Sequence, residues 1–132
     1  MKRRLEALEK MERVHKQMHD LAVWRLARLE LERDSLVEDH RAMLAAMDGG
    51  PMSYGAPAMA ATRRIRAVEI GIAAAKRECA AQTKRAFEQG TRAKLADRAL
   101  VDVEARYREH RERKELADLI DASVLNPKSS PA

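Results

Sequence analysis

Two histidines, His15 and His19, have the spacing of metal ligands on a helix, because residues four apart lie on one face. A catalytic zinc site also needs a third ligand and, in the common helical motif, a general base between the histidines. Here Lys16, Gln17 and Met18 intervene instead. We therefore expect no metal site and interpret both histidines as surface or seam-edge residues.

Nucleophilic chemistry has one candidate, the single cysteine Cys79. A reactive thiolate needs a nearby base and a set of oxyanion donors, and the expected neighbours of Cys79 are alanines and isoleucines. The chain also has no glycine-rich phosphate loop, no pair of cysteines and no Ser–His–Asp arrangement. We expect a small buried thiol at Cys79, no cofactor and no enzymatic activity.

Trp24 is the most informative single side chain, because exposed tryptophans concentrate binding energy at interfaces. It lies off the main apolar stripe of its helix, beside Ala27 and Leu31. Either it anchors a partner or it packs at the edge of the fold. Several of the seven methionines fall on the stripe itself, where core packing is the simpler interpretation than an adaptable binding face.

The composition indicates which secondary structure positions these residues. Among 132 residues only four are aromatic, 36% are charged, and Ala, Leu, Arg, Glu, Lys and Met dominate, all of which favour helix. No run of about 18 apolar residues is present, and the start is charged, so we expect a soluble, cytoplasmic, unprocessed chain. The fold class is predicted to be all-α.

Glycine and proline divide the chain once, between Asp48 and Pro57. We predict a helix over about 2–47, a loop over about 48–57 and a helix over about 58–122, followed by a disordered tail over 123–132. Two long helices joined by a short loop fold most simply as an antiparallel coiled-coil hairpin, here a single unit spanning 1–122.

Apolar residues alternate at spacings of three and four along both helices. The seam predicted for the second helix is Ala61, Ile65, Val68, Ile72, Ala75, Cys79, Gln82, Ala86, Gln89, Ala93, Ala96, Leu100, Val103 and Tyr107. The looser seam predicted for the first is Leu8, Met11, His15, Met18, Ala22, Leu26, Leu29, Leu36, Met43 and Met47, with Arg33 and His40 on the same stripe. The same seams serve a monomeric hairpin or a paired dimer.

The second helix is longer than the first, so we expect residues 106–122 to overhang without an internal partner. This stretch still carries Leu116, Leu119 and Ile120, and an unpartnered apolar stripe is a candidate docking surface. Charge also changes along the helix. Residues 63–98 hold ten basic and four acidic side chains, whereas residues 99–122 hold five and seven.

A charged run near the end of the second predicted helix resembles the charged segment near the end of proteins of the flagellar export protein FliJ family. The YscO-type proteins of type III secretion are related to that family. The run reads Arg108-Glu109-His110-Arg111-Glu112-Arg113-Lys114-Glu115-Leu116-Ala117-Asp118. The start, Lys2-Arg3-Arg4-Leu5-Glu6, and the run from Leu26 to Arg33 are similar to that family as well.

This resemblance implies a cytoplasmic stalk, peripheral at the inner face of the membrane through its partners. Those partners are a hexameric export ATPase, a membrane protein of the export gate, and export chaperones. The residues expected to bind partners are Trp24, Arg108, Arg111, Arg113, Lys114, Glu115, Leu116, Leu119 and Ile120. The alternatives are a generic basic coiled-coil adaptor and a non-specific nucleic-acid-associated protein, since the net charge is +5. We expect no specific nucleic-acid partner.

Overall fold

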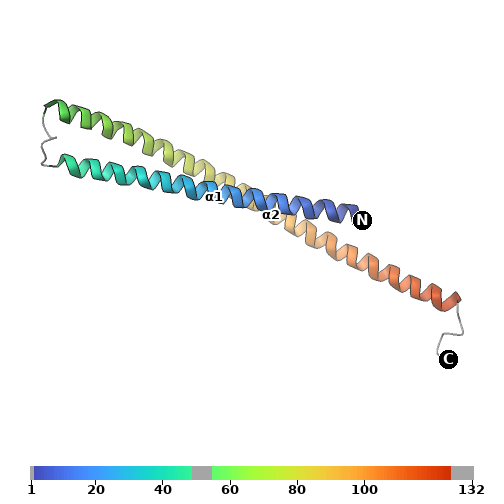
Figure 1. The fold of residues 1–132 in the computed structure, drawn as a ribbon. Helices are drawn as coiled ribbons and strands as arrows, with labels where there is room; N and C mark the ends of the chain where they lie inside the picture. Colours follow the sequence, from blue (N-terminus) through green and yellow to red (C-terminus); the bar gives the residue numbers. More distant parts are fainter. Residues whose placement is uncertain (1, 49–54, 126–132) are drawn as a thin grey trace. The chain divides into compact units, whose positions relative to one another are not determined.

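The computed structural model describes residues 2–48 and 55–125, and these form two helices and no strand. Helix α1 spans Lys2–Met47 and helix α2 spans Gly55–Leu125 (Figure 1). The all-α hairpin class predicted from the sequence is confirmed. Helix α2 begins three residues before the predicted start at 58 and continues three residues beyond the predicted end at 122, into the predicted tail. The middle of the predicted loop and the rest of the predicted tail lie outside the described residues.

The start of α2 shows why the predicted boundary was late. Gly55 adopts a φ of 73°, a left-handed conformation that glycine tolerates, and the helix continues from it. Pro57 is the third residue of α2, and proline is tolerated in the first turn of a helix, where backbone N–H groups have no intrahelical partner. Glycine and proline therefore mark the beginning of this helix rather than excluding it.

The chain divides into two compact units, which we describe separately. The loop-end unit comprises residues 17–90, and the terminal unit combines residues 1–16 with residues 91–132. In the loop-end unit the two helices run antiparallel. His40 of α1 meets Glu69 of α2, and His19 of α1 lies beside Gly90 of α2. From the first contact to the second, the residue number falls on α1 and rises by the same amount on α2. The two ribbons of this unit run antiparallel in Figure 1.

The seam predicted for α2 is confirmed along its whole length. Every one of its positions is buried or half-buried, including Gln82 and Gln89. Six of its fourteen positions are alanine or cysteine, and the described residues include no large side chain that is completely buried. The helices therefore approach closely but bury little apolar area per layer, so we expect modest stability from this interface.

The seam predicted for α1 is wrong at two positions. Met11 and Met18 are 51% and 40% exposed, whereas Glu12 is only 7% exposed and His19 is half-buried. The true seam keeps the spacing set further along the helix, and its described members are Leu5, Leu8, Glu12, His15, His19, Ala22, Leu26, Leu29, Arg33, Leu36, His40, Met43 and Met47. This face points inward even where its residues are polar, because a helix rotated to bury Met11 and Met18 would turn all the remaining seam residues outward.

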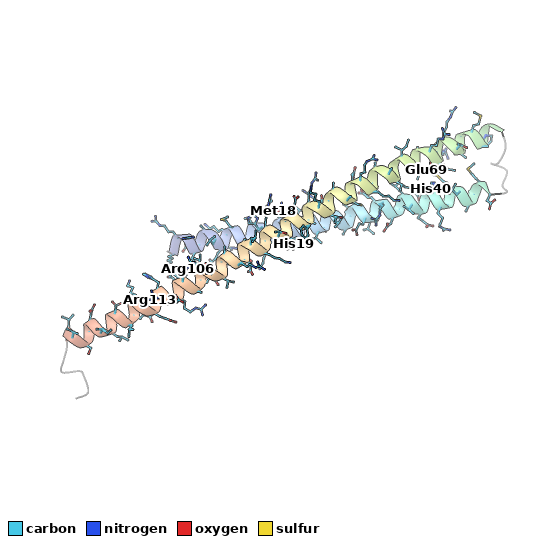
Figure 2. The ribbon with its side chains drawn as sticks, turned by 180° about the vertical axis from the view of Figure 1, so that it is seen from behind. Met18, His19, His40, Glu69, Arg106 and Arg113 are labelled. Atoms are coloured by element: carbon cyan, nitrogen blue, oxygen red, sulfur yellow. The ribbon has the colours of Figure 1, made fainter. Side chains whose placement is uncertain are left out.

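Several polar seam residues have partners. Glu12 is paired with Lys16, with 2.6 Å between carboxylate and ammonium. Gln82 donates a hydrogen bond from its side-chain amide to the carbonyl oxygen of Ala22, at 3.0 Å, which joins the two helices. His40 Nε2 lies 3.1 Å from Glu69 Oε1, an exposed contact from one helix to the other whose two residues are labelled in Figure 2. Such contacts satisfy polar groups that would otherwise lose water on burial.

In the terminal unit, pairing ends near Tyr107 of α2. Val103 is buried and Tyr107 is half-buried, but every residue from 108 to 125 is exposed. We call residues 108–125 the end segment of α2. It corresponds closely to the overhang predicted over 106–122, and it remains helical without a second helix covering it.

Candidate partner-binding surfaces

The side chains considered for chemistry, His15, His19 and Cys79, all lie on the seams of the two helices. His15 is half-buried on the α1 seam, and its Nδ1 atom is buried without a hydrogen-bond partner. His19 lies beside Gly90, with its Nδ1 atom 3.9 Å from Asp20 Oδ1. Within residues 2–48 and 55–125, no group of three or more His, Cys, Asp or Glu side chains is placed to hold a metal ion. Cys79 is buried on the α2 seam.

Eight of the nine residues predicted to bind partners lie in the end segment of α2, and all eight are exposed. Three of them form an apolar stripe: Leu116, Leu119 and Ile120 are 59%, 68% and 54% exposed. Val124 continues the stripe at the next turn. Three large apolar side chains within five residues of an uncovered helix are typical of a surface that binds another protein.

This apolar stripe is not a continuation of the seam. Leu116 is nine residues beyond Tyr107, which is about two and a half helical turns, so the two side chains lie on opposite faces of α2. Continued at its spacing of three and four, the seam instead passes through His110, Lys114, Ala117 and Asp121. A longer α1 running along the same seam would therefore leave this stripe exposed. The stripe is suited to a different partner.

Charged side chains flank the stripe, several of them in contacts with each other. Arg111 lies over the ring of Tyr107, with 6.0 Å between guanidinium carbon and ring centroid, and 3.9 Å from Glu115. These residues, with Glu104, Arg108 and Glu112, line a hollow of about 320 Å³ on this flank of α2. Exposed ion pairs of this kind contribute little to stability and exchange readily for others. Arg113, labelled in Figure 2, and Lys114 are exposed in the same segment.

Trp24, the ninth predicted residue, lies in the loop-end unit and is 59% exposed. The guanidinium of Arg28 is 5.9 Å from the centroid of its ring, within the range of a cation–π interaction, and Arg28 also lies 3.5 Å from Glu32. Trp24 as a whole residue is thus more exposed than covered. The binding of a partner at Trp24 stays a prediction, as does its alternative, packing at the edge of the fold.

A groove between the helices of the loop-end unit was missed in the sequence. It has a volume of about 150 Å³ and is lined by Met18, Leu21, Ala22 and Arg25 of α1 and by Gln82, Arg85, Glu88 and Gln89 of α2. The signal was present in the spacing of Met11, Val14, Met18 and Leu21, a second apolar stripe beside the seam. Placing Met18 on the seam concealed it. A second hollow of about 210 Å³, mostly apolar, lies near the loop between the ends of the helices.

Comparison with protein-family models, with curated proteins and with solved structures returned no match in any of the three. Neither described helix is both long enough and apolar enough to cross a membrane. The functional interpretation therefore depends on the surfaces described above and on the resemblance of the late charged run.

Proposed function

We propose that this protein is a non-enzymatic coiled-coil component of the flagellar or type III protein export apparatus. It acts as a stalk or chaperone escort that docks on the hexameric export ATPase and on the export gate. It works in the cytoplasm, at the inner face of the membrane, and reaches the membrane only through its partners. The observation that carries this proposal is the end segment of α2, a helix with an apolar stripe that no part of α1 covers.

The physical support lies in the contrast between paired and unpaired helix. An isolated helix is marginal in water, whereas a helix continuous with a packed one is already nucleated. Helix α2 is continuous from Gly55 to Leu125, so its packed part holds the end segment in helical form. A partner that binds Leu116, Leu119 and Ile120 then loses less free energy to ordering the chain. This is the property required of a segment that inserts into or docks on another assembly.

The nucleic-acid alternative is supported by one observation, the basic surface of α2 in the loop-end unit. Exposed side chains there include Arg63, Arg64, Arg66, Lys76, Arg77, Lys84 and Arg85. Attraction to phosphates through such residues is non-specific and weakens steeply with salt. Binding to duplex DNA that persists at about 200 mM salt would favour this alternative over the export proposal.

Secretion in cells tests the export proposal. Deletion of the gene is expected to abolish flagellar or type III secretion, and the intact protein supplied in trans is expected to restore it. A variant with Leu116→Ser, Leu119→Ser and Ile120→Ser is expected to fail, because it removes the apolar stripe without touching the seam. Ile70→Ser is the matched control, since Ile70 is similarly exposed on α2 in the loop-end unit. Normal secretion after deletion would refute the proposal.

A further inference from the structure

The groove of the loop-end unit has a distinct chemistry. Three of its lining residues are apolar, Met18, Leu21 and Ala22, and it carries one guanidinium from each helix, Arg25 on α1 and Arg85 on α2. Figure 2 marks Met18 at this level of the unit. The volume of about 150 Å³ equals that of an engineered apolar cavity that accepts benzene, so one leucine-sized side chain fits. The groove therefore selects an apolar side chain that has carboxylates beside it.

The lining also carries a net positive charge. Glu88 is the one acidic residue of the lining, against two arginines. Arginines bind carboxylates with two parallel hydrogen bonds where the geometry permits, which favours an acidic partner over a basic one.

The last eleven residues of α2 have the reciprocal chemistry. Residues 115–125 contain three acidic side chains and no basic one. Glu115 precedes Leu119 by four residues, so the two share a face of the helix. Leu116 and Ile120 lie on either side, and all of these side chains are exposed. Glu115 has a distant contact with Arg111, at 3.9 Å on the surface, which is readily exchanged.

We propose that residues 115–125 of one molecule dock in the groove of a second molecule, with Leu119 seated over Met18 and Leu21. Glu115 and Asp118, which lie on one side of Leu119, are then near Arg25 and Arg85, whereas Asp121 lies on the far face of the incoming helix. Residues 115–125 cannot fill the groove of their own molecule, because the groove and this stretch include parts of the same uninterrupted helix, α2, which cannot pack against itself, so a second copy supplies them.

This contact goes beyond the proposed export function and stands without it, since it is formed by this chain alone. It covers Leu116, Leu119 and Ile120, the same side chains that the proposed function assigns to a partner. Self-association and partner docking are therefore mutually exclusive, and the assembled form protects the apolar stripe until a partner displaces it. An interface of this size is small, so we expect a dissociation constant on the order of 10–100 μM.

Analytical ultracentrifugation of the full chain with charge-reversed variants tests the contact. In the groove variant, Arg25→Glu is combined with Arg85→Glu, and in the end variant, Glu115→Lys is combined with Asp118→Lys. Each variant alone sets like charges against each other, so self-association is expected to weaken at least about tenfold. When the groove variant and the end variant are mixed in equal amounts, the groove of each faces an end segment of opposite charge on the other. Association is then expected to return.

The matched control combines Arg77→Glu with Lys84→Glu, which changes the charge equally on exposed residues of α2 outside the groove lining. It is expected to associate like the wild type, and circular dichroism establishes that every variant is helical. A wild-type chain that stays monomeric up to about 500 μM overturns the proposal, since that exceeds the expected dissociation constant several-fold. Association that is unchanged in the end variant overturns it as well, because another surface then pairs the chains.

Discussion

Replacing Gly90 with alanine tests the register of the two helices at one defined point. A Cβ atom at this position would lie 3.1 Å from Nε2 and 3.2 Å from Cδ2 of His19. At Gly71, on the same helix, an added Cβ would lie 3.7 Å from Cδ1 of Leu36, which is an ordinary contact. The two glycines therefore differ in the space above them and not in secondary structure.

The expected magnitudes follow from these distances. Alanine is favoured over glycine inside a helix by about 1 kcal/mol, so Gly71→Ala is expected to raise the free energy of unfolding by that amount. For a chain of this size the melting temperature rises by about 3–5 °C. Gly90→Ala has the same helical gain, but the crowded imidazole opposes it. The His19 side chain is 39% exposed and can partly yield, so we expect a stabilisation at least about 0.5 kcal/mol smaller than at Gly71.

Urea denaturation followed by circular dichroism at 222 nm measures both variants, and a double-mutant cycle isolates the contact. In a His19→Ala background the crowding is gone, and Gly90→Ala is expected to stabilise by about 1 kcal/mol. Equal effects of Gly71→Ala and Gly90→Ala, unchanged by His19→Ala, would refute the reasoning. His19 would then not pack against α2, and the register with Met18 on the seam would have to be reconsidered.

Further predictions concern the core, a surface pair and a buried amide. Ile65→Ala is expected to lower the free energy of unfolding by about 2–4 kcal/mol in the urea assay, because Ile65 is buried. Ile70→Ala, at an exposed position, is expected to change it by less than about 0.5 kcal/mol. Similar effects of the two substitutions would contradict the seam. Hydrogen bonds from Arg41 to the carboxylate, with the attraction of its charge, lower the pKa of Glu38, so their stabilising effect is present at neutral pH and is lost as the pH falls through that lowered pKa. Arg41→Ala is expected to return the pKa of Glu38 to its ordinary value in an NMR titration, and an unchanged titration would show that the pair does not form in solution. Gln82→Ala removes a hydrogen bond between the helices and is expected to cost about 1 kcal/mol; an unchanged urea midpoint would mean that the amide does not join them.

The fold could be predicted because its signal is periodic and long. Spacings of three and four persist along α2 from Ala61 to Tyr107, and every position in that series is buried or half-buried. The end of pairing followed from the unequal helix lengths alone. Close to Gly55 and Pro57 the boundary was less predictable, because the same residues that interrupt a helix can also begin one.

The seam of α1 was harder to predict because its apolar residues do not all lie at the positions that its spacing of three and four turns inward. Between Leu8 and Ala22 the apolar choice is Met11 and Met18, but the inward positions belong to Glu12 and His19. The spacing decides which residues face inward, because the many seam residues beyond Ala22 fix the rotation of the helix and because the polar side chains have room. Gly90 leaves space for His19, a relation between distant residues that one helix read alone does not show.

The docking surfaces were partly visible in the sequence. The stripe of Leu116, Leu119 and Ile120 was recognisable as an apolar face beyond the end of α1. The groove was not, since it needs Met18 of α1 and Arg85 of α2 in one place, and this depends on the register of the two helices. Correcting the seam by one position moved Met18 from the core to the surface and revealed the groove.

The most direct test of the export proposal is the binding of the purified full chain to the purified export ATPase of its host. The proposal predicts a complex at micromolar concentrations. It also predicts that the complex is lost when Arg111, Arg113 and Lys114 are changed to Glu and when the apolar stripe is changed to Ser. Ile70→Ser is expected to leave the complex intact. Absence of a complex between the wild-type proteins at micromolar concentrations would contradict the proposed function.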